Sequence, residues 1–479
     1  MKKKKKIRLK SKLLRNIFSL IVLAVVILAI VEVLKLGILP DKYLYLFLGG
    51  EGLLFLLGFF LYNRRNKVLM VFGIIFYLIS IFGNIFGYYY LSKINNYVDT
   101  SFKKEYFTIK TTYYVVASKN DTIESTNELS KDSNILYYKY SKSIDKALKS
   151  LGKYNYTETD SVLRDMIQIT TDNKYLLISK ANYDYFFDSI NIDTANKDDY
   201  KIIDEFDVYE KVVVNNKVKD SYNIYINGLD FTGVMRDYNL IVTVNTKTKK
   251  VVLTSIPRDY YIDVPAYKMK DTLMCLGSLD SEVSKEALEK LFNIEIDYTI
   301  NLNTTSLVDV VDSIGGVEFC SDYDFTTTHA LVLDTYNDKG KNKLHVSKGC
   351  DTYNGLEILA IARERNAFPG RDRYRQKNCR QILINIVKKL ASATTLTNYD
   401  DILSSFEGLY TTDMNDKAVK KLIKTALNDP NFEIIEQSVD GVDGIGIGHL
   451  GTQESWIITP DMNTVNDASK QIKKVLNEK

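Results

Sequence analysis

The 479-residue chain has little of what many enzymes use to build an active site. Its only histidines, His329, His345 and His449, are scattered and do not have the spacing of metal ligands. No glycine-rich phosphate loop is present, and no arrangement of residues typical of a covalent nucleophile stands out. These absences argue against covalent catalysis and against a histidine-bound metal.

Long apolar runs are missing after Leu91, but three of them precede it: Ile17–Leu39, Tyr43–Tyr62 and Val68–Leu91. Each is close to the roughly 20 residues that a helix needs to cross a bilayer. The first run is too long for the apolar core of a signal peptide, and no small-residue cleavage site follows it. We therefore expect three transmembrane helices.

Basic residues predict how these helices are oriented. The tail through Arg15 carries nine lysines and arginines and no acid, and the loop 63–67 carries three more. Positive residues remain on the cytoplasmic side, so residues after Leu91 are expected outside the cell membrane. Residues 99–479 have a net charge of −9, which argues against a nucleic-acid binder.

Glu51 lies in the middle of the second apolar run. A carboxylate at that depth is costly and usually points into a helix bundle. It contacts either a lipid or partner group, or it is protonated or paired with a neighbouring helix; we favour the second interpretation, because desolvation favours the neutral acid.

Three segments follow from these patterns: residues 1–98 with the basic tail and the spans, residues 99–218 as an accessory α/β domain, and residues 219–479 as the catalytic domain. The accessory segment alternates strand-like and helix-like stretches and shows no cluster of catalytic residue types. After residue 219, strands interleave with helices, which predicts an α/β sandwich. The expected helices there are Val283–Phe292, Ser306–Ile314, Asn354–Ala362, Tyr374–Leu390 and Val465–Leu476.

Two aspartates flank neighbouring predicted strands. Asp230 comes just after one strand and Asp237 just before the next, so both lie at one end of the sheet. Paired carboxylates suit Mg²⁺, which prefers oxygen ligands and shares them with substrate phosphates. The alternative is that both simply cap turns, and the pair alone favours this alternative.

Four arginines stand where they could meet an anion. Arg258 directly follows a strand, Arg363 and Arg365 follow the helix that begins near Asn354, and Arg375 opens the next helix on its apolar face. Arginine at a helix N-terminus suits phosphate oxygens. Each alone is more often a surface ion pair of little energetic value. Because no nucleophile is evident, displacement at phosphorus assisted by a metal fits these residues best.

Four stretches of the chain resemble signatures of the LytR–CpsA–Psr family. They are Asp237–Asn245 (DYNLIVTVN), Leu253–Asp259 (LTSIPRD), Val311–Val317 (VDSIGGV) and Asn354–Arg365 (NGLEILAIARER). The likeness runs from about Tyr222 to the C-terminus, and the three spans followed by an accessory domain resemble the capsule-associated branch of the family.

This resemblance implies an α/β/α sandwich with a long apolar pocket for a polyprenyl chain. It implies a Mg²⁺-dependent transferase that moves a glycopolymer phosphate (capsule, teichoic acid or similar) from a polyprenyl pyrophosphate to peptidoglycan. By motif, Asp230 and Asp237 match the metal-linked acids. The expected pyrophosphate-binding residues are Arg258, Arg363, Arg365 and Arg375. Either Asp237 or Asp259 is the expected general base, and Arg258 would act with them in catalysis.

The sequence also departs from the family pattern. Met235 stands where an arginine is usual, with Arg236 beside it, Cys275 stands near a usual histidine, and the segment Asn378–Arg380 reads NCR in place of an Asn–Gln–Gln run. These changes affect the expected acceptor or headgroup contacts. Two alternatives to the transferase remain, namely a hydrolase that uses the same site with water, and a membrane-held scaffold that binds lipid or polysaccharide without catalysis.

The four cysteines all lie in the expected extracellular part, where disulfides are permitted. Cys320 ends a strand and Cys350 immediately precedes the helix that delivers Arg363 and Arg365, so we expect these two to be bridged. For Cys275 and Cys379, a second bridge and two separate thiols are both open, with a slight preference for the bridge because free thiols outside the cytoplasm risk oxidation.

Overall fold

The computed structural model describes residues 2–102, 105–139, 143–172, 174–189, 196–229, 235–278, 281–331, 342–390, 410–428, 432–448 and 453–479. The chain divides into two compact units, each of which is described by itself. The first consists of residues 1–104, 216–218 and 415–432, and the second of residues 105–215, 219–414 and 433–479.

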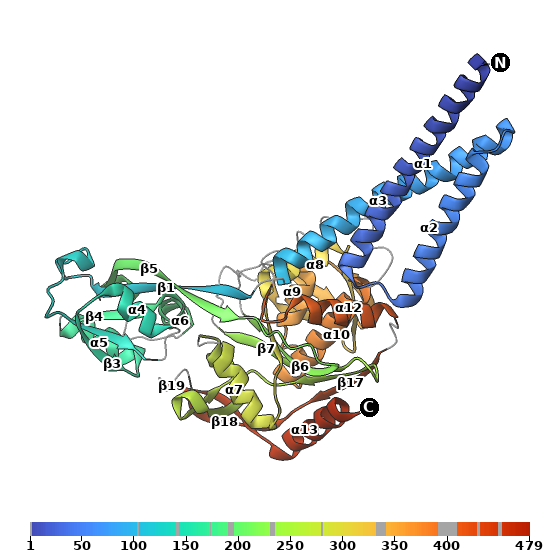
Figure 1. The fold of residues 1–479 in the computed structure, drawn as a ribbon. Coiled ribbons are helices and arrows are strands. Elements are labelled where there is room, and N and C mark those ends of the chain that lie inside the picture. The colour runs from blue at the N-terminus through green and yellow to red at the C-terminus, as the bar shows by residue number, and fades with distance from the viewer. Residues whose placement is uncertain are drawn as a thin grey trace. The chain divides into compact units, whose positions relative to one another are not determined.

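Three long helices dominate the first unit: α1 (Lys2–Leu36), α2 (Asp41–Tyr62) and α3 (Lys67–Phe102) (Figure 1). All three are long and apolar enough to cross a membrane. The helices extend beyond the apolar runs, since α1 includes the basic tail from Lys2 and α3 continues past Leu91. Helix propagation continues through lysine-rich sequence because lysine is a good helix former.

Polar contacts join these helices along their length. Glu51 Oε2 accepts hydrogen bonds from Ser80 Oγ (3.1 Å) and Asn84 Nδ2 (2.9 Å) of α3. Asn95 of α3 donates to Glu32 Oε2 of α1 (2.8 Å). Glu51 is thus paired with a neighbouring helix, as the favoured interpretation predicted, and this pairing reduces the cost of burying a carboxylate.

Helix α12 (Asp416–Asn428) belongs to the same compact unit, although the sequence placed it in the catalytic domain. Lys424 Nζ lies 2.9 Å from Asp41 Oδ1, and Lys420 Nζ lies 3.9 Å from Asp99 Oδ1. The helix therefore meets the start of α2 and the end of α3. Its grouping follows from long-range contacts that local sequence patterns do not reveal.

The accessory segment forms a five-stranded sheet in the order β3-β2-β4-β1-β5. Its strands are β1 (Tyr106–Ser118), β2 (Asn134–Tyr138), β3 (Asn155–Thr159), β4 (Tyr175–Ser179) and β5 (Tyr200–Val213). Its helices are α4 (Ile144–Leu151), α5 (Val162–Thr171) and α6 (Lys180–Ser189). Every residue of β4 is buried, which fits an apolar central strand with both faces covered. The expected α/β character of this segment is confirmed.

The central sheet of the catalytic segment has six strands in the order β16-β11-β6-β7-β8-β17. These strands are β6 (Ser221–Leu229), β7 (Arg236–Asn245), β8 (Lys250–Ser255), β11 (Tyr298–Asn303), β16 (Tyr410–Thr412) and β17 (Glu433–Ser438). Strands β6, β7 and β8 run antiparallel, while β11 is parallel to β6 and β17 is parallel to β8.

Helices cover both faces of this sheet, which makes the expected α/β/α sandwich (Figure 1). One layer holds α7 (Ser281–Phe292) and α13 (Met462–Asn477), and the other holds α8 (Thr304–Ser313), α9 (Gly355–Arg363) and α10 (Asp372–Leu390). Neighbouring residues of β8 identify the two faces, because successive strand residues point in opposite directions. Thr254 of β8 accepts a hydrogen bond from Gln437, which also donates to the backbone of α13, so Thr254 faces the α13 layer. Ser255, the next residue, accepts a hydrogen bond from Arg380 of α10 and faces the other layer.

Gly355 allows α9 to cross α8 closely. A Cβ atom at this position would lie 2.4 Å from the backbone oxygen of Val308, which is too close for any other residue. Asp312 of α8 also accepts a hydrogen bond from the Gly355 N–H (2.7 Å), and Asn354 caps the helix with Glu357. This crossing fixes the helix that ends at Arg363.

Four short hairpins or strand pairs complete the unit: β9 (Tyr261–Val264) with β10 (Met269–Thr272), β12 (Val317–Ser321) with β15 (Gly349–Tyr353), β13 (Phe325–Ala330) with β14 (Lys343–Val346), and β18 (Gly441–Gly448) with β19 (Gln453–Pro460). Cys320 and Cys350 face each other across β12 and β15 and form the expected disulfide.

Candidate active site at one end of the central sheet

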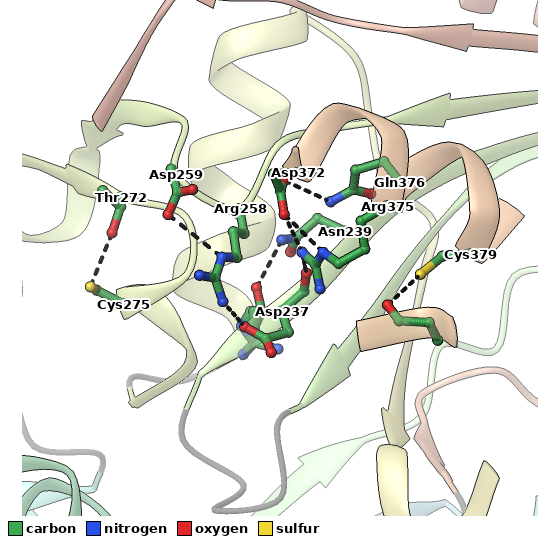
Figure 2. A network of polar contacts seen from close by, with 12 residues as sticks. Asp237, Asn239, Arg258, Asp259, Thr272, Cys275, Asp372, Arg375, Gln376 and Cys379 are labelled. Atoms are coloured by element: carbon green, nitrogen blue, oxygen red, sulfur yellow. Dashed lines mark hydrogen bonds and ion pairs between the residues drawn. The ribbon is translucent and has the colours of Figure 1, made fainter. Parts of the chain in front are cut away.

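The candidate site begins where β8 ends and its antiparallel neighbour β7 starts (Figure 2). Arg258 follows β8, and Asp237 is the second residue of β7, so the antiparallel pairing brings them to the same end of the sheet. Arg258 Nη1 donates to Asp237 Oδ1 at 2.5 Å. Arg258 Nε also lies 3.6 Å from Asp259 Oδ1. One guanidinium therefore stands between two carboxylates.

Arg375 joins this group from α10. It is buried, as its place on the apolar face of the helix predicted. Its guanidinium forms an ion pair with Asp372 Oδ1 at 2.6 Å and donates to the backbone oxygen of Asp237 at 2.5 Å. The first turns of α10 are thus tied to the start of β7.

Arg365 lies close enough to the other two arginines to feel their charge. Burial lowers the pKa of Arg365, and the like charges of Arg258 and Arg375 lower it further. Arg365 keeps solvent-exposed surface although neighbouring groups partly desolvate its guanidinium, whereas Arg363, the last residue of α9, is half-buried. The structure therefore brings together Arg258, Arg365 and Arg375, which places three positive charges near one another.

Glu364, between the two arginines of this segment, holds the backbone that carries them. It is fully buried and accepts hydrogen bonds from Thr328 and from the N–H groups of Asn366 (2.7 Å) and Ala367 (2.9 Å). Burial acts to raise the pKa of Glu364, but these hydrogen bonds outweigh it and lower the pKa. The extended segment after α9 is therefore anchored by a carboxylate that the sequence did not single out.

The two candidate bases differ in their electrostatic surroundings. Burial acts to raise the pKa of Asp237, but Arg258 and Arg375 outweigh it and the pKa lies below its ordinary value. For Asp259, burial dominates over the attraction of Arg258 and raises the pKa. Asp259 is thus the more basic of the two carboxylates, and Asp237 is the more firmly ionised.

Three buried polar atoms near α10 have no hydrogen-bond partner within the part of the chain that the structure describes. They are Asn378 Nδ2, Gln376 Oε1 and Tyr238 Oη. An unsatisfied buried polar atom costs about 1–3 kcal/mol, and such atoms are concentrated in native structures where a ligand or water completes the bonding. Their place beside Arg375 and on the neighbouring strand β7 extends the polar site along α10.

Met235 stands where the family usually has an arginine, and the neighbouring Arg236 does not take that place in the arginine group. Its guanidinium is buried and donates to the side-chain oxygens of Asn227 and Asn301 on β6 and β11. Asp230 and residues 231–234 lie outside the described residues, so the predicted pairing of Asp230 with Asp237 stays a prediction.

The preference for a bridge between Cys275 and Cys379 is wrong in this structure, because neither cysteine forms a disulfide. Thr272 Oγ1 donates to Cys275 Sγ (3.0 Å), whereas Cys379 Sγ donates to the backbone oxygen of Ala362 (3.4 Å). Figure 2 shows them on opposite sides of the arginine group. Burial raises the pKa of Cys379 to about 11, so the thiol is protonated and little reactive at neutral pH.

Two further residues of the site were missed by sequence reasoning. Asp372, whose pKa stays low because Arg375 and Arg258 outweigh its burial, is the main partner of Arg375. Arg380 donates to Ser255 Oγ (2.6 Å) and Glu436 Oε2 (3.1 Å), which ties α10 to β8 and β17. The sequence did contain a signal for the ion pair of Asp372 with Arg375, because residues three apart at the start of a helix are neighbours on its surface.

The donor set around Asp237 fits a hard divalent cation that is shared with a substrate. Arg258 engages Asp237 Oδ1, and the Asp237 side chain is partly exposed. Mg²⁺ is commonly held by one or two carboxylates together with substrate phosphates. Among the described residues, no group of three or more His, Cys, Asp and Glu side chains could hold a metal by itself.

The geometry places a group of arginines and aspartates at one end of an α/β/α sandwich, in a chain with three helices of membrane-spanning length. A family model for the LytR_cpsA_psr family matches residues 185–474. The match begins within the accessory segment and ends within α13. The chain belongs to the LytR–CpsA–Psr family of glycopolymer transferases.

Several named relatives are similar to about half of the chain. The polyisoprenyl-teichoic acid–peptidoglycan teichoic acid transferase TagU of Bacillus anthracis is 27% identical over 266 residues, which cover 54% of this chain and 79% of that protein. TagU of Bacillus licheniformis is 26% identical over 265 residues, with the same coverage of 54% and 79%.

Solved structures match about half of the chain at lower sequence identity. TagV of B. subtilis is 21% identical, covers 55% of this chain and 100% of its own, and gives a TM-score of 0.46. A structure of TagT bound to LIIa-WTA is 23% identical, covers 54% of this chain and 92% of its own, and gives a TM-score of 0.43.

Proposed function

We propose that this protein transfers a phosphate-linked glycopolymer from a polyprenyl pyrophosphate carrier to peptidoglycan. The observation that carries the proposal is the grouping of Arg258, Arg365 and Arg375 around one end of the central sheet, with Asp237, Asp259 and Asp372 between them. Charges taken out of water are expensive to hold, and such groups are typical of sites where charge changes during a reaction.

The arginines would bind the pyrophosphate and stabilise the charge that develops on the leaving group. Arginine presents a planar fork of donors to phosphate oxygens, and its charge does not depend on pH. A hydroxyl of peptidoglycan attacks the phosphorus that bears the polymer, so a new O–P bond forms while the P–O bond to the carrier phosphate breaks. The polyprenyl phosphate leaves with the electron pair of that bond.

Asp259 is the better candidate for the base that accepts the hydroxyl proton. Asp237 forms a 2.5 Å ion pair with Arg258 and has a lowered pKa, which makes it a weak base. Asp259 has a raised pKa and a longer, 3.6 Å approach to the same arginine. A general base is most effective when its pKa lies nearer the working pH.

Asp237 would hold Mg²⁺ together with the substrate pyrophosphate, and Asp230 is the proposed second ligand. The ion would supply charge neutralisation for the phosphates. Asp237 is suited to this role because Arg258 and Arg375 keep it ionised.

The three helices would anchor the protein in the cell membrane as a multi-pass protein, with the N-terminus cytoplasmic and the large segment outside. This orientation is supported by the basic tail and by the basic loop 63–67. The site would then face the compartment in which peptidoglycan and the lipid-linked polymer meet. Teichoic acid is the first polymer to test, because the relatives are named for it, and capsule polymer is the second.

A transfer assay with the full-length chain tests the proposal. The purified protein is mixed with a radiolabelled polyprenyl-pyrophosphate-linked teichoic acid, with and without peptidoglycan. We expect label in the peptidoglycan fraction and release of polyprenyl phosphate. Free polymer phosphate formed equally well without peptidoglycan would identify a hydrolase, and intact donor under both conditions would identify a non-catalytic scaffold.

A further inference from the structure

The hairpin of β18 and β19 exposes apolar side chains on one face. Ile445 lies directly opposite Trp456 in the register, and Ile447 lies two residues further along β18. Cross-strand partners and residues two apart share a face, so these three side chains form one patch. They are 63%, 54% and 49% exposed for Ile445, Trp456 and Ile447, respectively. Single exposed apolar residues are common, but a contiguous patch with a tryptophan is typical of an interaction surface.

This hairpin is bonded directly to the candidate active site. The N–H of Ile458, two residues from Trp456, donates to the backbone oxygen of Asp259 at 2.7 Å. Arg373, the neighbour of Asp372 in α10, donates to the backbone oxygen of Gly441 at 3.0 Å and forms an ion pair with Asp440. The patch is therefore held in a fixed relation to the proposed base and to the helix that carries Arg375.

The charges around the patch limit what can occupy it. Asp443 and Glu454 share the face with the three apolar side chains, and residues 441–448 and 453–460 contain no lysine or arginine. Arg373 of α10 pairs with Asp443 at 3.4 Å and offsets its charge, so the border carries no net positive charge. A border without net positive charge offers no electrostatic attraction to an anionic lipid surface or to a polyanionic polymer. Three side chains also cannot supply the roughly 800 Å² per partner that a stable dimer interface buries.

A neutral glycan fits these features. The C–H faces of sugar rings pack against an indole ring, while sugar hydroxyls donate hydrogen bonds to carboxylates such as those of Asp443 and Glu454. We propose that the face of the β18–β19 hairpin formed by Ile445, Ile447 and Trp456 binds the neutral glycan strand of the acceptor. This inference rests on the proposed function for the identity of the acceptor, and it places the acceptor beside Asp259.

Trp456 is the only tryptophan of the chain, so its fluorescence reports on this face alone. The full-length protein in detergent micelles is titrated with a soluble chitin oligosaccharide. We expect a saturable change of tryptophan emission. Ile445→Ser, which retains the reporter, should weaken binding about tenfold, the size of a moderate hot-spot contact. Val442→Ser is the matched control, since Val442 is 72% exposed but lies on the opposite face of the same strand.

Three results would overturn the inference. The first is an emission spectrum that does not respond to the oligosaccharide, and the second is equal weakening by Ile445→Ser and Val442→Ser. The third is a response only to micelles containing phosphatidylglycerol or only to poly(glycerol phosphate), which would identify the patch as a lipid or donor surface.

Kinetics separate this inference from the proposed function. In the transfer assay, Trp456→Ala should raise the apparent KM for peptidoglycan about tenfold and leave kcat and the donor KM unchanged. An unchanged acceptor KM in an active enzyme would contradict the acceptor surface while the proposed function stands. Saturable glycan binding by a protein that transfers nothing would contradict the proposed function and leave the glycan-binding face in place.

Discussion

The accessory sheet and the site end of the central sheet use charged residues in opposite ways. In the accessory segment, pairs such as Arg164–Asp160 (2.6 Å) lie on the surface with both side chains more than half exposed. At the site, Arg258 and Asp237 approach to 2.5 Å with side chains 15% and 27% exposed. Exposed pairs contribute about 0–1 kcal/mol, whereas buried charges must be organised against a large desolvation cost. The contrast supports the proposal that the chemistry takes place at the end of the central sheet, and no catalytic cluster stands out among the described residues of the accessory segment.

The largest expected effect on the transfer rate comes from substituting Arg258, the arginine of the buried pair. Arg258→Ala should reduce transfer at least about 1000-fold, because a charge-assisted contact to the reacting phosphates is lost in a desolvated site. Arg164→Ala, which removes an exposed arginine of the accessory segment, should leave the rate within about twofold of the wild type. The rates come from the transfer assay, and thermal unfolding of both variants checks the fold. Equal rates for the two variants would remove Arg258 from the mechanism.

The pH dependence of transfer sharpens the assignment of the base. Because the pKa of Asp259 is raised, its carboxylate form appears only above the ordinary carboxyl range near about pH 4. Transfer should therefore increase as pH rises through this raised pKa. Asp259→Asn should abolish that limb and reduce the rate by about 10²–10⁴-fold.

The exposed Asp263, paired with Lys290 at 3.1 Å, provides the matched control for Asp259. Asp263→Asn should keep both the rate and the pH profile. If Asp259→Asn retains the acidic limb, another group is the base, and Asp237 becomes the next candidate.

The disulfide is expected to stabilise the strand pair of β12 and β15. Cys320 and Cys350 are 30 residues apart, and removing a bridge that closes such a loop should lower the free energy of unfolding by about 3 kcal/mol. Chemical denaturation of a Cys320→Ser/Cys350→Ser variant measures this loss. Addition of a reductant should destabilise the wild type and leave the double variant unchanged. A wild type that is insensitive to reductant would contradict the expected contribution.

The smallest expected effect concerns Asp165, an acid on helix α5 of the accessory segment whose pKa is strongly raised. Burial raises its pKa to about 6, and its Oδ1 has no hydrogen-bond partner among the described residues. Because this pKa is raised in the folded state, the contribution of the protonated carboxyl to stability is fully present below about pH 4. The contribution is lost as pH rises through about 6. Asp165→Asn should therefore stabilise the protein by up to about 3 kcal/mol at neutral pH.

Thermal unfolding between pH 4 and 7 measures this effect, with the exposed Asp160→Asn variant as the control. The gain from Asp165→Asn should disappear toward pH 4, where the native carboxyl is already protonated. A gain that is independent of pH would show that packing, and not ionisation, is responsible.

Much of the framework was predictable because it depends on local patterns. The three apolar helices, the α/β sandwich, the pairing of Cys320 with Cys350 and the burial of Arg375 follow from run length, alternation and helical spacing. The meeting of Asp237 and Arg258 was not predicted from the sequence, although the predicted hairpin accounts for it, because an antiparallel hairpin brings the start of one strand to the end of its neighbour.

Other features depend on tertiary contacts that have no local signature. Arg236 is withdrawn by two asparagines on other strands, and Cys275 and Cys379 are separated by the arginine group (Figure 2). The grouping of α12 with the apolar helices depends on Lys420 and Lys424, whose partners are more than 300 residues away in sequence. Spacing along the chain does not encode such pairings.

Binding of polyprenyl pyrophosphate to the full-length protein tests the arginine site most directly. Affinities of the wild type, Arg258→Ala and Arg164→Ala are measured in detergent micelles for polyprenyl pyrophosphate and for polyprenyl monophosphate. The arrangement of Arg258, Arg365 and Arg375 predicts that the wild type and Arg164→Ala bind the pyrophosphate more tightly than the monophosphate, and that Arg258→Ala loses at least about tenfold in pyrophosphate affinity. Equal affinity of all three proteins for both lipids would contradict a pyrophosphate site at the end of the central sheet.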